Sequence, residues 1–308
     1  AGELGACRAN ADTGFAPTLS GFGPLEVGQS NGRSVFLDQD RIKPSSMIAP
    51  RSISSVSEGQ VKFLPSRNVE VEFVNGVAAM ADSGLYGDTR VAAGIIGFAD
   101  LQLGSRGKGV LEAMIAAAPG RFRGIRRTGA WDPDPSIGRG HGVTGPGLYG
   151  DAEFRKGLAE IAPLGLIFEG VCRHPQIPEF MDLARAFPDT TMVLNHIGSI
   201  AGVGAYAGKR EEVFEDWKKS IINLASCPNV VVKLGGINRD YNGFGWHENP
   251  TPPTSQDLCD ATRPYYETVI EHFGPGRCMF ESNFPVDKIS CAYNVLWNAF
   301  KRVAKDYS

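Results

Sequence analysis

Two of the five histidines, His174 and His196, each follow an apolar run that has the character of a buried strand. Proline stops the first run directly after His174, and Gly198 allows a sharp exit after His196. An imidazole can act as a general base, polarise an ester carbonyl or ligate a divalent metal ion. A lone histidine near an apolar run is commonly a hydrogen-bonded core residue, but two at equivalent strand ends predict a functional site.

Other polar residues follow further apolar runs, and their types suggest substrate binding. Arg126 could hold a substrate carboxylate through two parallel hydrogen bonds, or it could form a structural ion pair. Lys233 ends another run, and we expect it to contact the substrate. His247 lies in a long loop with Phe244 and Trp246, which either shapes the substrate pocket or packs on its own aromatic rings.

These residues need a scaffold that brings strand ends together, and the chain has the pattern of one. From about Val69, six apolar runs alternate with amphipathic stretches, which is typical of a parallel sheet built from βα units. The expected strands are 91–98, 122–125, 166–168, 192–194, 230–232 and 278–280. The expected helices are 69–81, 109–118, 152–162, 178–187, 211–225, 255–272 and 292–304.

Two shorter runs upstream, at 34–37 and 61–64, bring the strand count to eight. This predicts a (β/α)8 TIM barrel with its chemistry at the C-terminal strand ends. A doubly wound sheet is the main alternative, but it would normally carry a Gly-rich phosphate turn, and none is seen. Residues 1–68 are rich in Ser, Gly and Pro, and we interpret them as an atypical segment that could supply strands 1 and 2. Residues 69–308 are the expected barrel domain.

Composition and charge limit the classes of partner that we expect for this chain. With 31 basic and 34 acidic residues, the net charge of −3 gives no electrostatic surface for nucleic acid or an anionic membrane. No window is apolar enough for a membrane span and no secretory signal is seen, so we expect a cytoplasmic protein. The six cysteines include no CxxC pair, which favours reduced thiols. We expect a small-molecule substrate and, as a protein partner, another copy of the chain.

Short phrases at the strand ends resemble those of a known family. They are Phe122 to Arg126, His174-Pro175, Val193 to Gly198 and Met279 to Asp287. They are similar to the amidohydrolase-2 branch of the amidohydrolase superfamily, whose members are TIM-barrel hydrolases and decarboxylases, with or without a metal ion. This branch includes sugar lactonases and pyrone-dicarboxylate lactonases. The similarity runs from about Val69 to the C-terminus and implies hydrolysis of a lactone.

The resemblance also suggests roles for single residues. His174 resembles the family's strand-5 histidine, His196 its strand-6 histidine, and Arg126 an arginine that holds an acidic substrate in lactonases. Asn283 stands where the family usually has a strand-8 aspartate. Because an amide cannot act as a carboxylate base, Asp287 is the nearest replacement. The family's strand-1 His-x-His pair has no counterpart, since the first 140 residues contain no histidine.

The leading hypothesis is therefore a hydrolase that acts on a carboxylated lactone. Asp287 would activate water, with Asn283 beside it in the catalytic set. His174 and His196 would polarise the ester carbonyl or hold one divalent ion, Zn or Mn. A metal-dependent decarboxylase of the same superfamily is one alternative. A catalytically inactive barrel that binds a small acid is the other, because the strand-1 histidines are missing.

Overall fold

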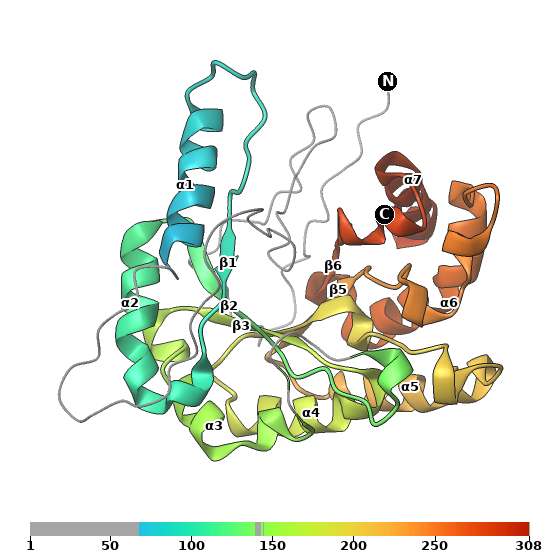
Figure 1. Cartoon of the computed structure of the whole chain (residues 1–308), viewed down its shortest axis with the longest axis horizontal. Helices are drawn as coiled ribbons and strands as arrows, with labels where there is room; N and C mark the ends of the chain where they lie inside the picture. Colours follow the sequence, from blue (N-terminus) through green and yellow to red (C-terminus); the bar gives the residue numbers. More distant parts are fainter. Residues whose placement is uncertain (1–67, 139–142, 144, 308) are drawn as a thin grey trace.

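The computed structural model describes residues 68–138, 143 and 145–307 of the chain. At its centre is one sheet of six parallel strands, which pair in chain order (Figure 1). The strands are β1 (Ile95–Gly97), β2 (Phe122–Thr128), β3 (Ile167–Val171), β4 (Met192–Leu194), β5 (Val230–Leu234) and β6 (Cys278–Phe280). All six strands predicted within this part of the chain are therefore present.

Helices connect the strands and cover the outer face of the sheet. They are α2 (Lys108–Ala117), α3 (Ala152–Leu158), α4 (Ile177–Ala186), α5 (Arg210–Leu224), α6 (Ser255–Phe273) and α7 (Tyr293–Ala304), preceded by α1 (Asn68–Asp82). In Figure 1, α2 to α7 lie on an arc outside the strands, so the sheet forms half of a barrel. The (β/α)8 prediction is confirmed to this extent. The strands expected at 34–37 and 61–64 lie outside the described residues.

The two faces of the sheet carry different side chains, because successive residues of a strand point to opposite sides. Phe168 and Val232 are fully buried in the hydrophobic core that the sheet forms with its helices. The alternate positions of the same strands hold Glu169 and Lys233. The register sets Arg126 of β2 directly beside Glu169 of β3. Charged groups from separate strands therefore meet on the inner face.

Local sequence signals determine where α6, the helix before β6, begins and ends. Thr254 begins α6 with a reciprocal capping box: its hydroxyl accepts the N–H of Asp257 at 3.2 Å, and the Asp257 carboxylate accepts the N–H of Thr254 at 2.8 Å. Gly274 ends the helix with a φ of +75°, a conformation that glycine adopts without steric cost. The chain then enters β6 within four residues, which fixes where Glu281 emerges.

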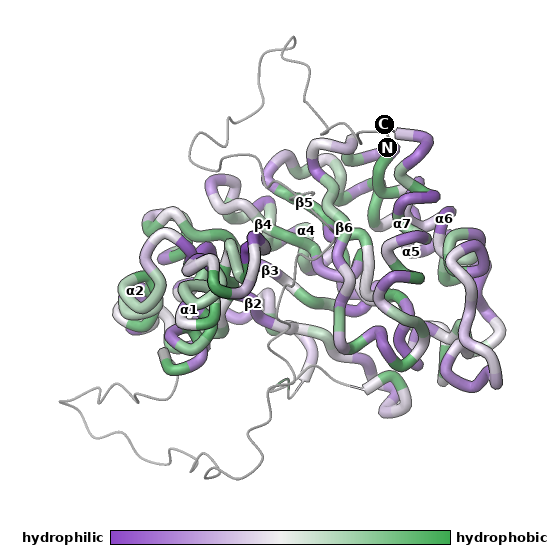
Figure 2. The backbone as a smooth tube through the Cα atoms, turned by 90° about the horizontal axis from the view of Figure 1, so that it is seen from above, coloured by the Kyte–Doolittle hydropathy of each residue, from purple (hydrophilic) through white to green (hydrophobic). Residues whose placement is uncertain are grey.

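The first helix is set apart from this arc. α1 lies beside α2 in both views (Figure 2), and the Asn75 side chain donates a hydrogen bond of 3.1 Å to the carbonyl of Ala117. Val71 and Val74 are buried on the same side, whereas Phe73 is 58% exposed.

Among the residues described, no helix is both long enough and apolar enough to cross a membrane.

Candidate active site

His196 lies where β4 ends, on a backbone segment of unusual conformation. The φ angle is +55° at His196, +45° at Ile197 and +42° at Ser199. This left-handed region is costly for a β-branched residue, and such strain is commonly held at functional sites. The indole of Trp217 fixes the segment by donating a hydrogen bond of 2.7 Å to the carbonyl of Ile197. Gly236 faces the ring, and a Cβ there would lie 2.1 Å from His196 Nδ1, so only glycine fits.

Glu281, the residue that follows β6, is the partner of this histidine. Its Oε1 atom lies 2.5 Å from His196 Nδ1 and also accepts the backbone N–H of His196 at 2.9 Å. A carboxylate can only accept in this contact, so Nδ1 carries a proton and the neutral ring has its lone pair on Nε2. A histidine oriented in this way by a carboxylate has the geometry of a general base.

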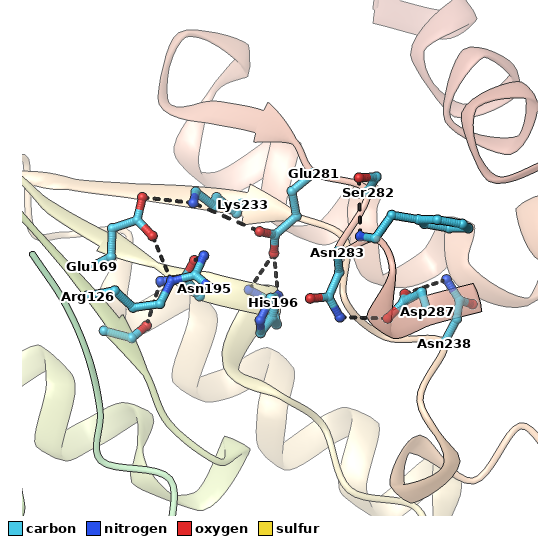
Figure 3. A network of polar contacts seen from close by, with 12 residues as sticks. Arg126, Glu169, Asn195, His196, Lys233, Asn238, Glu281, Ser282, Asn283 and Asp287 are labelled. Atoms are coloured by element: carbon cyan, nitrogen blue, oxygen red, sulfur yellow. Dashed lines mark hydrogen bonds and ion pairs between the residues drawn. The ribbon is translucent and has the colours of Figure 1, made fainter. Parts of the chain in front are cut away.

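The histidine and its carboxylate belong to a longer ionic network on the inner face of the sheet (Figure 3). Glu169 of β3 accepts hydrogen bonds from Arg126 Nε at 3.0 Å and from Lys233 Nζ at 2.8 Å. The same Lys233 Nζ lies 4.0 Å from Glu281 Oε2. Arg126 also donates to Asn195 Oδ1 at 2.9 Å. Two carboxylates and two cations thus balance one another.

The cations keep both carboxylates ionised. Burial alone would raise the pKa of Glu169, but the charges of Lys233 and Arg126 outweigh it, and the pKa is lowered. Burial also acts to raise the pKa of Glu281, but its contact with His196 Nδ1 and the charge of Lys233 overcome this effect and lower the pKa to about 2. Glu281 is therefore an anion at neutral pH and can orient the imidazole.

Asp287 has a different environment, although it lies close to the network in Figure 3. Its fully buried carboxyl accepts amide hydrogen bonds from Asn283 at 2.6 Å and from Asn238 at 3.3 Å. Burial raises the pKa of Asp287 to about 6, although the two amides act to lower it. Within the described residues, the buried Oδ1 of Asn238 has no hydrogen-bond partner. Asp287 is thus enclosed by amides, and no part of it meets solvent.

His174 lies in a separate group at the end of β3. Its Nδ1 accepts the backbone N–H of Ala201 at 3.3 Å, so the proton of the neutral ring is on Nε2. Burial lowers the pKa of His174 to about 4, against the opposing effect of Asp132. The ring of Tyr206 packs edge-on at 4.8 Å, and its hydroxyl donates to Asp132 at 2.8 Å. His174 is therefore a neutral hydrogen-bond donor at physiological pH.

The structure joins only part of the predicted set. Arg126, His196 and Lys233 meet in one network. Asn283 and Asp287 form a pair beside it, and His174 belongs to the separate group described above. His247 is outside all of these: its imidazole lies 3.7 Å from the exposed Glu248, in the loop after β5.

Three members of the network were not among the predicted site residues. Glu169 and Asn195 are almost completely buried, and Glu281 follows a strand whose polar end was recognised without a role for this residue. One signal was available for Glu169: an acid in the middle of an apolar run is rarely buried unless it is paired. Nothing in the sequence identifies which cation pairs with it.

A metal ion is the cofactor that the resemblance implies, and the donor set can be tested directly. Within the described ranges, no three His, Cys, Asp or Glu side chains gather closely enough to hold an ion. His196 still offers the lone pair of its Nε2, but His174 does not offer one, because its Nδ1 accepts a backbone N–H and its Nε2 therefore carries a proton. These residues do not fit a metal site, so no step below uses one.

A parallel half-barrel with an oriented base at its C-terminal strand ends has the layout of barrel enzymes, whose active sites lie at that face. Comparison with known families then identifies the group: the Amidohydro_2 model, described as amidohydrolase, matches residues 76–307. The chain belongs to the amidohydrolase family. The resemblance drawn from the strand-end phrases is thereby confirmed.

Two curated relatives illustrate the distance to known proteins. The uncharacterised protein y4mH of Sinorhizobium fredii is 35% identical over 215 residues, which cover 70% of this chain and 64% of that protein. An L-fucono-1,5-lactonase of Burkholderia ambifaria is 27% identical over 208 residues, covering 66% of this chain and 58% of the lactonase. The chain thus spans less than two thirds of the length of either relative.

Among solved structures, an amidohydrolase from Burkholderia multivorans with bound HEPES superposes with a TM-score of 0.56. The match has 20% identity and covers 79% of this chain and 82% of that one. A second crystal form of that amidohydrolase, with bound zinc, gives a TM-score of 0.55 at 19% identity, over 79% of this chain and 81% of that one. At this identity the likeness supports the fold alone.

Proposed function

We propose that this chain hydrolyses a lactone that carries a carboxylate group. The observation that carries the proposal is the contact between His196 and Glu281, which holds one imidazole with its lone pair on Nε2. A hydrolase needs a base of this kind to take a proton from water. The role of base, which the sequence assigned to Asp287, passes to His196 in this proposal because Asp287 has no exposed surface.

The proposed reaction has two stages. In the first, His196 Nε2 removes a proton from water as the water oxygen attacks the lactone carbonyl carbon, giving a tetrahedral oxyanion. In the second, the ring carbon–oxygen bond breaks, and the protonated His196 returns the proton to the departing alkoxide. The product is one hydroxy acid, so one water is consumed. Glu281 stays ionised throughout and stabilises the imidazolium.

His174 fits the role of a neutral electrophile in the same reaction. Because its Nδ1 accepts the N–H of Ala201, its Nε2–H is the donor available to a carbonyl oxygen. A hydrogen bond that strengthens as the oxyanion forms can contribute about 3–4 kcal/mol to the barrier reduction. The burial that lowers the pKa of His174 to about 4 keeps the ring neutral at working pH.

The choice of a lactone has support from a curated relative. A curated relative that matches 66% of this chain is an L-fucono-1,5-lactonase. The carboxylate of the proposed substrate is not assigned to Arg126 or Lys233, because Glu169 and Glu281 balance the charges of these two cations. The zinc bound by a structural neighbour belongs to that protein, and the donors described here do not reproduce a zinc site.

A panel of neutral and carboxylated lactones, followed by proton release, tests the proposal. His196→Ala and Glu281→Gln should each lower kcat by about 10²–10⁴-fold, the range typical of a lost or misoriented general base. Glu267→Gln is the matched control, because this acid pairs with Arg263 on the outer helix α6. Equal rates for the parent and His196→Ala, or no turnover of any lactone by the parent, would overturn the assignment.

A further inference from the structure

Two arginines lie on the inner side of neighbouring strands, and they differ in their counter-ions. Arg126 on β2 is neutralised by Glu169 at 3.0 Å. Arg173, just beyond the end of β3, is 7% exposed, and no carboxylate oxygen lies within ion-pair distance of it among the residues described. Within the part of the chain that the structure describes, Arg173 is therefore a buried cation without a paired carboxylate.

The position of Arg173 places it above the catalytic network. Its backbone is extended, with φ −80° and ψ 155°, so it continues the alternation of β3 and falls on the same face as Glu169. Arg173 is four positions beyond Glu169, which in an extended chain corresponds to about 13 Å toward the C-terminal end of the strand. The next residue is His174, the proposed electrophile. Arg173 thus lies just beyond the C-terminal end of β3, the end of the strands at which barrel enzymes bind their substrates.

The contacts of Arg173 leave part of its guanidinium unused. Nη2 donates to the carbonyl of Ile137 at 2.9 Å and, at 3.4 Å, to that of Gly138. The ring of Tyr241 lies 4.1 Å from the guanidinium carbon. Nε is buried, and within the described part of the chain it has no hydrogen-bond partner. Neutral carbonyls and an aromatic ring solvate the charge without neutralising it.

The acids on the neighbouring loop are engaged elsewhere. Asp132 accepts the hydroxyl of Tyr206 at 2.8 Å and the N–H of Asp134 at 2.8 Å. Asp134 in turn accepts the N–H groups of Ser136 and Ala205, at 2.9 and 2.7 Å. Neither carboxylate forms an ion pair with Arg173.

A buried charge without a counter-ion raises the free energy of the folded protein. An anion that binds to the guanidinium neutralises this charge and can accept two parallel, charge-assisted hydrogen bonds from it. We propose that Arg173 binds the carboxylate of the substrate and so selects anionic lactones, a role that the sequence suggested for Arg126. The proposal deepens the proposed function and rests on it for the identity of the reaction. A carboxylate held at Arg173 lies one residue from His174, so anchoring and carbonyl polarisation come from the same strand end.

A purely structural role for Arg173 is the competing explanation, because its contacts connect the loops that hold Ile137 and Tyr241. A matched pair of substrates distinguishes the two roles. The γ-lactone of 2-hydroxyglutarate carries a carboxylate, whereas γ-valerolactone has the same ring without the charge. A structural defect lowers the turnover of both, whereas loss of an anion site raises KM for the carboxylated lactone alone.

The experiment compares the parent with Arg173→Met, Arg173→Lys and the control Arg185→Met. Arg185 is an exposed arginine on α4, whose guanidinium donates a hydrogen bond of 3.5 Å to Ser226 Oγ. We expect Arg173→Met to raise KM for the carboxylated lactone at least 30-fold while KM for γ-valerolactone changes less than threefold. For Arg173→Lys, the KM for the carboxylated lactone should lie between those of the parent and Arg173→Met, since lysine keeps the charge but cannot donate two parallel hydrogen bonds. A similar loss on both lactones, or no loss on either, would overturn the proposal.

A binding measurement keeps the anion site testable apart from the reaction. Calorimetry with 2-hydroxyglutarate, the open-chain hydroxy acid, should give binding to the parent, to Arg185→Met and to His196→Ala, and at least tenfold weaker binding to Arg173→Met. If no lactone is hydrolysed but this pattern holds, the proposed function fails and the anion site stands. If the parent does not bind 2-hydroxyglutarate, or Arg173→Met binds it equally well, the anion site fails.

Discussion

The inner side of the half-barrel has two buried polar regions whose charges are balanced in different ways. In the floor network, Arg126, Glu169, Lys233 and Glu281 form alternating ion pairs, and the pKa of each acid is lowered. In the second region, at the end of β3, Arg173 contacts the carbonyl of Ile137 and the ring of Tyr241, and no acid among the described residues pairs with it. A balanced network holds a base in place, whereas an unbalanced charge is suited to an incoming ion.

Removing one floor acid should have the largest effect on stability. Glu169→Gln leaves the half-buried Arg126 and Lys233 without the buried carboxylate that they share, and breaking a buried ion pair typically costs about 3–5 kcal/mol. Arg173→Met breaks no ion pair among the described residues and leaves no carboxylate uncompensated, so it should lower the free energy of unfolding less than Glu169→Gln does. Urea unfolding of both variants measures the contrast. Equal destabilisation would show that the two regions are not balanced differently.

The second expected effect concerns the geometry of the base. Gly236→Ala places a Cβ 2.1 Å from His196 Nδ1 and requires a positive φ of an alanine, so the ring must move away from Glu281. We expect kcat to fall about 10²-fold, since a shift near 1 Å can have that effect. Gly276→Ala is the control, because a Cβ there meets nothing within 4 Å. Unchanged lactone turnover in Gly236→Ala would contradict the role of this contact.

The smallest expected effect concerns Asp287, an acid whose hydrogen-bond partners are amides, whereas the acids of the ionic network have cations as partners. The pKa of Asp287 is raised to about 6, so between about pH 4 and 6 the folded protein holds a proton that the unfolded chain has lost. The free energy of unfolding therefore falls as the pH rises through this window. Asp287→Asn removes the titration, so its stability relative to the parent should increase by about 2–3 kcal/mol from pH 4 to pH 7.

Chemical denaturation of the parent and Asp287→Asn at several pH values provides the measurement. The absolute stability of the variant is not the test, because the amide can lose or gain hydrogen bonds with Asn238 and Asn283 at every pH. The test is how the difference in the free energy of unfolding between the two proteins changes with pH, since only the titration of Asp287 produces such a change. Parallel curves for the two proteins would show that Asp287 does not titrate in this window.

Much of the scaffold could be predicted because its signals are local. The run Val230 to Val232 is apolar and β-branched, and the structure forms β5 there. The stretch 255–272 has helical spacing and a capping pair, and α6 covers it with one further residue. His196 was recognised for the same reason, since it directly follows a buried run. Such patterns depend on neighbours within a few positions of the chain.

The pairings within the site could not be predicted in this way. Glu281 contacts His196 across 85 positions of sequence, and Arg126 contacts Glu169 across 43. Which acid meets which cation depends on strand register and on the curvature of the sheet, and a one-residue change of register would turn each of these side chains to the other face. The sequence left open whether Arg126 binds a substrate carboxylate or forms a structural ion pair. The register of β2 and β3 sets Glu169 beside it, and the two side chains form an ion pair.

By itself, the sequence determined the order of strands and helices, the family, and the presence of histidines at the ends of two strands, because these depend on residue type and short-range spacing. Only the tertiary structure decided which charges are neutralised and which nitrogen of each imidazole carries a proton. Those properties depend on distances of 3–4 Å between groups that are far apart in the chain, and only the folded backbone fixes such distances.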